Sequence, residues 1–458
     1  MRSGASRCDA ADGPGGLRIS YGRCGCRGRT GRSPARPIAA GTRPPGCSRL
    51  MGPDLKLAKG ADIGAPAPRT PAGCSAPPSE AQPARVLHIV ENLDRGAVEN
   101  WLVRMLRHAH RRGVRLDWTF YCALGRAGAL DDEVRALGAQ IIYSPAPIGW
   151  KIPFVAALRN AARAGRYDVV HCHHDLVSGI YLLALTGLPI GRRIVHAHNA
   201  DEDVPTPSRI KQTLYRGPLR QICLRTADKI VGISNHTLDT LLAGRPRRAG
   251  RDLVHYYGVD PAPFEGVDTG RARLRRELAL TPEAKILLFA GRLVPEKNPL
   301  AAVDVLAAMH RRDPSVVGLF VGAGSMEPAL KARVSELGLQ AATHFLGWRG
   351  DVPAVMSACD WFILPRPEHP QEGFGLAVVE AQLAGLRLLL SYGIPDDPLL
   401  PTATCRRLPL ADSPEIWADA AFDMLRTPRP DRSAALAALA DSPMDLDTAL
   451  AGLIGLHG

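Results

Sequence analysis

The sequence predicts an α/β protein made of two doubly wound domains, each built around a parallel β-sheet. From Arg85 onward, short β-branched or apolar runs alternate with longer segments of helical period, which is typical of successive βαβ units. This alternation is interrupted between Asp252 and Gly270, where Gly and Pro residues predict a hinge, and it restarts near Lys285. A chain of 458 residues also exceeds what one core ordinarily accommodates.

The first 83 residues differ from the rest, because Gly, Ala, Pro, Arg and Ser dominate them and no long apolar run occurs. We predict that residues 1–83 are disordered, since such a segment cannot bury enough apolar surface to offset its ordering entropy. An Arg-rich, acid-poor composition resembles a transit peptide, but amphipathic periodicity is missing. A start codon assigned too far upstream, with translation beginning near Met51 or later, is the alternative.

The positive charge is concentrated in this extension. The chain carries a net charge of +12, and residues 1–83 hold 13 Lys and Arg against 5 acids, which leaves +4 for all that follows. The remainder shows no basic stripe with interleaved aromatic residues, so we do not expect nucleic acid as a partner.

The cysteines indicate a reducing compartment. Five of the ten lie in the extension, whereas Cys172, Cys223 and Cys359 sit inside apolar patterns, where a free thiol behaves as a small hydrophobe. Cys24 and Cys26 could bind a metal, but no second pair completes a zinc set. No apolar run approaches the roughly 20 residues of a membrane span. We therefore expect a cytoplasmic protein, at most peripherally associated with the inner face of the membrane.

The first domain is predicted over residues 84–267, and its first helix has a clear apolar face. Apolar side chains recur there at helical spacing, while Arg104, Arg107 and Arg111 are predicted to face water. The apolar positions are Val98, Trp101, Leu102, Met105, Leu106 and Ala109. The predicted strands are Arg85–Val90, Leu116–Leu124, Gln140–Ser144, Tyr167–His173, Arg193–His198 and Lys229–Ser234.

The second domain is predicted over residues 268–430, followed by C-terminal helices over 431–458 that pack back toward the first domain. Its predicted strands are Ile286–Ala290, Val317–Val321, Thr343–Leu346, Asp360–Leu364 and Arg387–Ser391. Two Rossmann-like domains then face each other across a cleft. In such sheets ligands bind outside the carboxyl ends of the strands, so the loops that follow the strands are the candidates for a site.

The most informative loop, Glu372-Gly373-Phe374-Gly375, follows the strand that ends at Leu364 and leads into a helix carrying Glu380. The two glycines allow close approach of the backbone, and the helix N-terminus offers unpaired N–H groups to an anion such as a diphosphate. The two carboxylates suit sugar or ribose hydroxyls. The alternative reading is a capping acid and a solvated helix acid.

A second loop carries two cations. Arg292 and Lys297 lie five residues apart on the turn that leaves the strand Ile286–Ala290, where they could clamp a pyrophosphate. An ordinary solvated turn with Glu296 paired to Lys297 is the alternative.

Together the two loops, Gly-Arg-Leu-x-x-Glu-Lys-Asn and Glu-Gly-Phe-Gly-x4-Glu, resemble those of the retaining glycosyltransferases of family 4, which have the two-domain GT-B fold. The resemblance implies that Arg292 and Lys297 bind the donor phosphates and that Glu372 contacts the transferred sugar. It also implies that Phe374 and Gly375 offer backbone N–H groups and that Glu380 holds the ribose.

The resemblance extends to the first domain. Gly96 matches the glycine-rich first loop that approaches the donor diphosphate, although Ala97 replaces the usual second glycine. His198, at the end of a strand, is the candidate to meet the donor sugar or the acceptor, and we treat it with Glu372 as catalytic. His196 and His198 share one face and would also suit a metal, but no third ligand lies at ligand spacing, so we expect no metal.

Two further positions are implied as donor contacts. Gly322 precedes Gly324 after the strand Val317–Val321, and the third glycine of a dinucleotide fingerprint is absent, which argues against a nicotinamide site. The resemblance places this loop in the donor cleft and Arg349 near the nucleotide base.

The expected activity is that of a hexosyltransferase, which moves a sugar with retention from a nucleoside diphosphate such as UDP or GDP to a hydroxyl of a glycan or lipid-linked acceptor. By resemblance, the pathway is bacterial surface polysaccharide synthesis, with no cofactor beyond the sugar nucleotide. A nucleotide-sugar epimerase or phosphorylase on the same fold, or a non-catalytic nucleotide-sugar-binding protein, are the alternatives.

Overall fold

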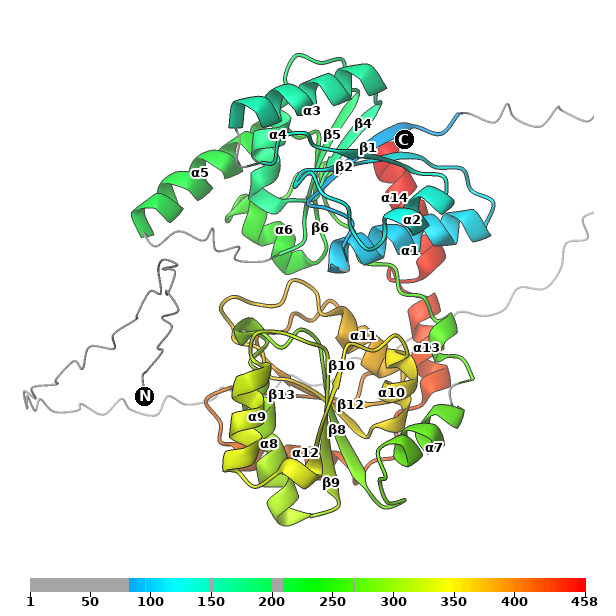
Figure 1. Ribbon diagram of the computed structural model, residues 1–458, viewed down its shortest axis with the longest axis vertical. Helices are drawn as coiled ribbons and strands as arrows, with labels where there is room; N and C mark the ends of the chain where they lie inside the picture. Colours follow the sequence, from blue (N-terminus) through cyan, green and yellow to red (C-terminus); the bar gives the residue numbers. More distant parts are fainter. Residues whose placement is uncertain (1–81, 95, 149–150, 200–208, 267) are drawn as a thin grey trace, which may run out of the picture. The chain divides into compact units, whose positions relative to one another are not determined.

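A computed structural model describes residues 82–94, 96–148, 151–199, 209–266 and 268–458 of the chain (Figure 1). The predicted disordered extension, residues 1–83, lies outside the described residues except for Gln82 and Pro83.

The first half of the described chain forms a parallel sheet in the order β3-β2-β1-β4-β5-β6-β7. Its strands are β1 (Arg85–Val90), β2 (Asp117–Cys122), β3 (Gln140–Tyr143), β4 (Val169–Cys172), β5 (Arg192–Ala197), β6 (Lys229–Gly232) and β7 (Asp252–Val254). The connecting helices are α1 (Ala97–Arg111), α2 (Asp131–Ala136), α3 (Lys151–Gly165), α4 (Ser178–Ala184), α5 (Arg209–Thr226) and α6 (Asn235–Leu242).

The second half forms another parallel sheet, in the order β10-β9-β8-β11-β12-β13. Its strands are β8 (Lys285–Ala290), β9 (Val316–Val321), β10 (Thr343–Gly347), β11 (Trp361–Leu364), β12 (Arg387–Ser391) and β13 (Cys405–Leu408). Its helices are α7 (Asp268–Glu277), α8 (Pro299–Arg312), α9 (Glu327–Glu336), α10 (Val352–Ala358), α11 (Leu376–Leu383) and α12 (Pro414–Met424).

The predicted fold class, two doubly wound α/β domains, is confirmed by these two parallel sheets. All of the predicted strands occur, within two residues of their expected ends. Two strands were not predicted. β7 is only three residues long and lies inside the predicted hinge, Asp252 to Gly270, while the edge strand β13 contains Arg406 and Arg407 in place of an apolar run.

Helix α1 buries the predicted apolar face, including Trp101, Leu102 and Met105, while Arg107 and Arg111 are exposed as expected. The prediction for Arg104 was wrong. Its guanidinium is half-buried and donates a hydrogen bond to the carbonyl oxygen of Gly258 at 2.8 Å, because the segment after β7 crosses this face of the helix.

The two C-terminal helices contact different halves of the chain. Helix α13 (Arg432–Ala440) contacts α11 of the second half, whereas α14 (Leu446–His457), drawn in red, lies against α1 of the first half (Figure 1). The chain between them pairs with the segment after β7, since Val259 N donates to Met444 O at 2.9 Å. His108 and Asp447 join α1 to α14 at 2.7 Å.

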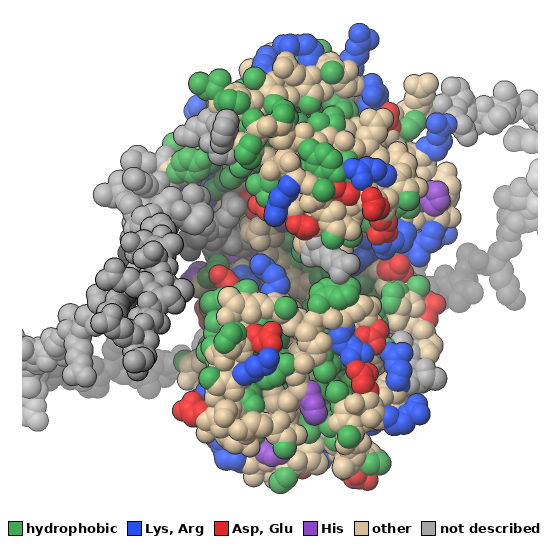
Figure 2. Space-filling model, viewed as in Figure 1, with side chains coloured by type: hydrophobic (Ala, Val, Ile, Leu, Met, Phe, Trp, Pro, Cys, Tyr) green, Lys and Arg blue, Asp and Glu red, His purple; other side chains and the backbone are tan. Residues whose placement is uncertain are grey.

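In the described part of the chain, none of the helices is long and apolar enough to cross a membrane. The cysteines expected to behave as small hydrophobes, Cys172, Cys223 and Cys359, are buried free thiols. On the face shown in Figure 2, Lys and Arg side chains lie interspersed with Asp and Glu side chains.

Candidate active site

A buried ion-pair cluster lies at the carboxyl edge of the second sheet. Lys297, which follows β8, donates a hydrogen bond from Nζ to Oε2 of Glu372 at 2.6 Å. Arg366, which follows β11, reaches the same oxygen from NH1 at 2.9 Å. The three side chains are 11–15% exposed, so solvent screens their interaction weakly. One carboxylate therefore faces two cations that come from two adjacent strand ends.

Burial and charge act on the pKa of both partners. Burial lowers the pKa of Lys297 below its ordinary value, although the Glu372 carboxylate opposes this shift. For Glu372, burial alone would raise the pKa, but the charges of Lys297 and Arg366 outweigh it and lower the pKa. The carboxylate is therefore ionised at neutral pH and can only accept hydrogen bonds.

Arg292 stands at the exposed rim of this cluster. Its charge lowers the pKa of both Lys297 and Glu372, so all three groups share one electrostatic environment. Its loop is held by its neighbours, because Gly291 N donates to Val321 O and Leu293 N donates to Ala323 O. Gly322 is required for this packing, since a Cβ there would lie 2.0 Å from the carbonyl oxygen of Gly291. The structure thus gives Gly322 a role in holding the Arg292 loop.

The N-terminus of α11 opens beside the cluster. Gly375 adopts φ +91° as the N-cap, a conformation that favours glycine, and no side chain caps the helix. Val378 N donates to Gly375 O at 2.8 Å, which leaves the N–H groups of Leu376 and Ala377, the first two residues of α11, to face an anion. Phe374 is buried and packs against the rings of Tyr256 and Tyr257.

Gly373 brings this loop against the first sheet. A Cβ at Gly373 would lie 2.5 Å from the carbonyl oxygen of His198, so only a glycine fits between the loop and the end of β5. The structure thus places His198 next to the Glu372 loop. Both ring nitrogens of His198 are engaged, however, with Tyr257 Oη at 2.8 Å and with His173 Nδ1 at 3.0 Å.

Arg349, Glu380 and Gly96, which were also predicted to contact the donor, have neighbours other than Lys297, Arg366 and Glu372. Arg349 forms ion pairs with Glu277 and Asp351, at 2.5 and 2.7 Å, and neither partner belongs to the Lys297 cluster. Glu380 is partly buried, and burial raises its pKa while the nearby Arg104 charge opposes that shift. At Gly96, the N-cap of α1, a Cβ would lie 2.1 Å from Glu99 Oε2, so the Glu99 side chain folds over this turn.

Arg366 was not predicted. The sequence does place this arginine after β11, at the same sheet edge as Arg292. Pro365 and Pro367 on either side of it, however, are typical of an ordinary loop. Its guanidinium also donates to the carbonyl oxygens of Pro370 and Gln371, each at 3.1 Å. Arg366 therefore fixes the loop that carries Glu372 as well as its charge.

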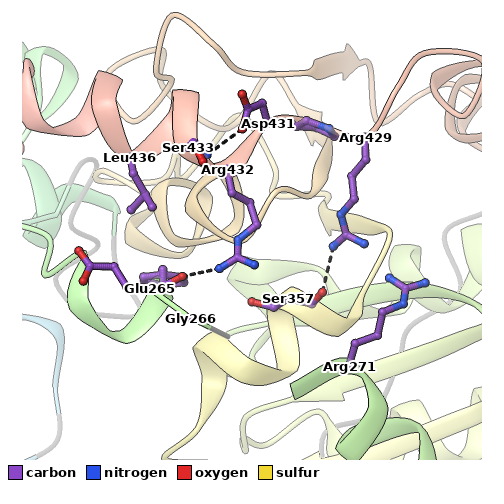
Figure 3. A pocket seen from close by; sticks show the side chains of 11 residues that line it. Glu265, Gly266, Arg271, Ser357, Arg429, Asp431, Arg432, Ser433 and Leu436 are labelled. Atoms are coloured by element: carbon purple, nitrogen blue, oxygen red, sulfur yellow. Dashed lines mark hydrogen bonds between the residues drawn. The ribbon is translucent and has the colours of Figure 1, made fainter. Parts of the chain in front are cut away.

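A separate hollow of about 630 Å³ lies away from these residues, around the start of α13 (Figure 3). Its arginines are bound to the protein itself. Arg271 pairs with Asp360 at 3.3 Å, Arg429 donates to Ser357 O and Cys359 O, and Arg432 donates to Phe264 O. None of the predicted site residues lines it.

Two family models match the chain. Residues 98–263 match the model described as "Glycosyltransferase Family 4", and residues 270–394 match "Glycosyl transferases group 1". The second match contains the whole Lys297 and Glu372 cluster.

The relatives and solved structures agree with these matches. The "Putative glycosyltransferase EpsF" of Bacillus subtilis is 24% identical and covers 81% of this chain and 96% of its own. An Escherichia coli "UDP-Gal:alpha-D-GlcNAc-diphosphoundecaprenol alpha-1,3-galactosyltransferase" is 26% identical over 57% of this chain and 67% of its own. The crystal structure of Anabaena Alr3699/HepE in complex with UDP superimposes with a TM-score of 0.66 at 18% identity, over 81% of this chain and 98% of that one.

The paired parallel sheets, the fold of the similar solved structures and the two family models together identify a glycosyltransferase of the two-domain GT-B fold. The chain belongs to glycosyltransferase family 4.

Proposed function

We propose that this protein transfers a hexose, with retention of anomeric configuration, from a nucleoside diphosphate sugar to a hydroxyl of a lipid-linked or oligosaccharide acceptor. The observation that carries the proposal is the contact of Lys297 and Arg366 with the Glu372 carboxylate beside the uncapped N-terminus of α11. This arrangement brings fixed positive charge and a hydroxyl-binding carboxylate together at one edge of the sheet.

The cluster suits the charge that develops in the reaction. Negative charge grows on the leaving diphosphate while the sugar becomes cationic, and preorganised cations and N–H groups stabilise the first of these. We assign Lys297, Arg292 and the backbone of Gly375 to the diphosphate and Glu372 to the sugar hydroxyls. In this proposal the protein's own cations neutralise the phosphates, without a metal at the donor.

The donor and acceptor classes rest on the relatives. The Escherichia coli relative is named for a UDP-Gal donor, a diphosphoundecaprenol acceptor and an α-1,3 product, and the Anabaena protein has been crystallised with UDP-glucose. We therefore propose a UDP-hexose as donor and a sugar on a polyprenyl diphosphate as acceptor. Such a step belongs to surface polysaccharide synthesis and would bring the enzyme to the inner face of the membrane as a peripheral protein.

The donor assignment is tested with Arg292→Ala. We expect kcat/KM for transfer to fall by roughly two orders of magnitude or more, the scale for one lost charge-stabilising group. The assay compares UDP-glucose, UDP-galactose and a GDP-hexose, with polyprenyl-diphosphate-linked and free sugars as acceptors. Near-normal transfer by Arg292→Ala would refute the donor site.

The stereochemistry is tested on the product. NMR of the anomeric proton should show the same configuration in the new linkage as in the donor, and an inverted linkage would overturn the retaining proposal.

A further inference from the structure

A layer of buried imidazoles covers one face of the first sheet. His88 on β1 pairs in register with His171 on β4, and His173, His196 and His198 continue the layer onto β5. Alternate residues of a strand share one face, which puts these side chains on the side covered by α1 and α14. All of them are 5% exposed or less. Nothing in the proposed transfer reaction requires such a layer.

Each of the rings of His198, His173 and His196 has one nitrogen within hydrogen-bonding distance of another side chain, which we call its outer partner. His198 Nδ1 lies 2.8 Å from Tyr257 Oη, His173 Nε2 lies 3.0 Å from His88 Nδ1, and His196 Nδ1 lies 3.1 Å from His171 Nε2. When the outer partners accept these hydrogen bonds, the second nitrogen of each inner ring carries a lone pair.

These second nitrogens converge. His173 Nδ1 lies 3.0 Å from His198 Nε2, and two facing lone pairs at that distance repel each other unless a proton or a cation lies between them. His196 Nε2 is fully buried without a hydrogen-bond partner among the described residues. Each of His173, His196 and His198 offers a ligand atom within 4.8 Å of the others.

We propose that His173, His196 and His198 form a binding site for one divalent transition-metal ion of the zinc class. Neutral imidazole is the form that binds such ions, and burial keeps these rings neutral by lowering the pKa of all three. Nitrogens about 2.0–2.1 Å from a tetrahedral zinc ion are about 3.3 Å apart, and His173 Nδ1 and His198 Nε2 lie 3.0 Å apart. Ligating histidines also normally donate their other N–H to an outer partner, as all three can here.

A second group, His88, His171 and His173, also meets the distance condition. It fits less well, because the His88 nitrogen that faces His173 is Nδ1, at 3.0 Å, and the other nitrogen of His88, Nε2, has no hydrogen-bond partner among the described residues, whereas each ring of the first group has an outer partner. The outer partners of His173, His196 and His198 therefore favour the site around β5.

The proposed metal site shares no residue with the donor cluster of Arg292, Lys297, Arg366 and Glu372. The sequence shows His196 and His198 two residues apart without a third ligand, and the third is His173, from the neighbouring strand β4. His198 nevertheless connects the two sites, since its carbonyl oxygen borders Gly373. A metal ion there would fix the end of β5 beneath the Glu372 loop.

The first experiment uses the full chain without a polyhistidine tag. The protein is stripped with a chelator, incubated with Zn²⁺ or Co²⁺ and passed through a desalting column. We expect about one equivalent of metal by elemental analysis, a higher melting temperature with Zn²⁺, and a tetrahedral Co²⁺ spectrum. A protein that retains no metal and shows no shift with either ion overturns the proposal.

Variants then locate the ion. His196→Asn and His198→Asn should abolish retention, while the exposed His110→Asn on α1 is the matched control and should retain one equivalent. If the buried variants do not fold, Tyr257→Phe removes only an outer partner and should weaken binding by about 10–100-fold. Binding that survives His196→Asn and His198→Asn but is lost in His88→Asn would overturn the assignment to this site.

Discussion

The carboxyl edges of the two sheets differ in charge, although both sheets are parallel and doubly wound. At the first, the strands β4 and β5 end in neutral, buried imidazoles such as His173 and His198. At the second, β8 and β11 are followed by Lys297 and Arg366, which face the ionised Glu372. The same topology therefore supports a cluster of neutral imidazoles after two strands of one sheet and a cluster of charged side chains after two strands of the other.

The difference shows that side-chain type, not sheet topology, sets what each edge can bind. Charged groups at the second edge suit a diphosphate, because they stabilise negative charge without reorganising. Neutral ring nitrogens at the first edge offer lone pairs instead, which suit a cation or a hydrogen-bond donor. The function of a protein with a common fold must therefore be inferred from the residues of its site.

The largest expected effect comes from removing the charge at the second edge. Lys297→Met should lower kcat/KM by about 100-fold or more, since it deletes a cation proposed to stabilise the leaving diphosphate. It should also lower the free energy of unfolding by about 3–5 kcal/mol, because Glu372 would stay buried with one partner fewer. Steady-state kinetics and urea denaturation measure the two effects.

Lys331→Met is the matched control, since this exposed lysine pairs with Glu327 on α9 and belongs to no candidate site. If both variants lose activity equally, the charged edge does not have the role proposed here.

The next effect tests how closely the two edges must approach. Gly373→Ala would place a Cβ 2.5 Å from the backbone carbonyl oxygen of His198, a contact that requires the Glu372 loop to move. We expect kcat/KM to fall by about 10–100-fold, since shifts of about 1 Å at a site have that scale. Gly217→Ala on α5 has open space around its Cβ and should leave activity unchanged. Equal activity of the two variants would contradict a close approach.

Most of the fold was predictable from the sequence because the buried strands are apolar runs separated by helical periods. Residues 286–290 and 387–391 are examples, and both were placed correctly. The short strand β7 and the arginine-containing edge strand β13 lack such runs, since an edge strand packs on fewer neighbours. Arg104 was misplaced because helical period alone does not show that a linker covers it.

The site was predictable only where its residues are neighbours in sequence. The loops of Arg292 and Glu372 carry their own signal, but the contact of Arg366 with Glu372 depends on how its loop folds back over Gly393. The imidazole layer depends on the strand order β1-β4-β5, which no local pattern specifies. Long-range contacts of this kind become visible only in the folded chain.

A moderate, pH-dependent effect on the free energy of unfolding is expected at the first edge, where Glu99 is a titratable carboxyl group. Burial, together with the charges of Glu91 and Asp94, raises the pKa of Glu99 to about 7, although its own backbone N–H opposes the shift. Because the folded pKa exceeds the ordinary value of 4.5, the folded state is favoured below pH 4.5 and loses this stability as pH rises to about 7. The loss is at most about 3 kcal/mol.

Glu99→Gln should therefore be more stable than the parent above pH 7 and differ little near pH 4.5. Urea denaturation across this range measures the difference, with the exposed Glu336→Gln on α9 as control. The donor KM of the parent should also rise with pH, since a charged Glu99 over Gly96 would repel a diphosphate. A stability difference that does not change with pH would argue against the raised pKa.

The smallest effect is expected where Asp397 joins the two halves. Its Oδ1 accepts hydrogen bonds from Asn235 N at 2.8 Å and Tyr256 Oη at 3.0 Å. Because this contact is partly exposed, Asp397→Ala should cost about 1 kcal/mol of unfolding free energy. Burial and the Asp397 carboxylate raise the pKa of Tyr256 to about 12, so the variant should also lower that pKa in a spectrophotometric titration. The neighbouring Asp396→Ala, which removes only an ion pair with Arg407, should leave the Tyr256 pKa in place. If both variants shift it equally, general surface charge is responsible and the contact between the halves is not.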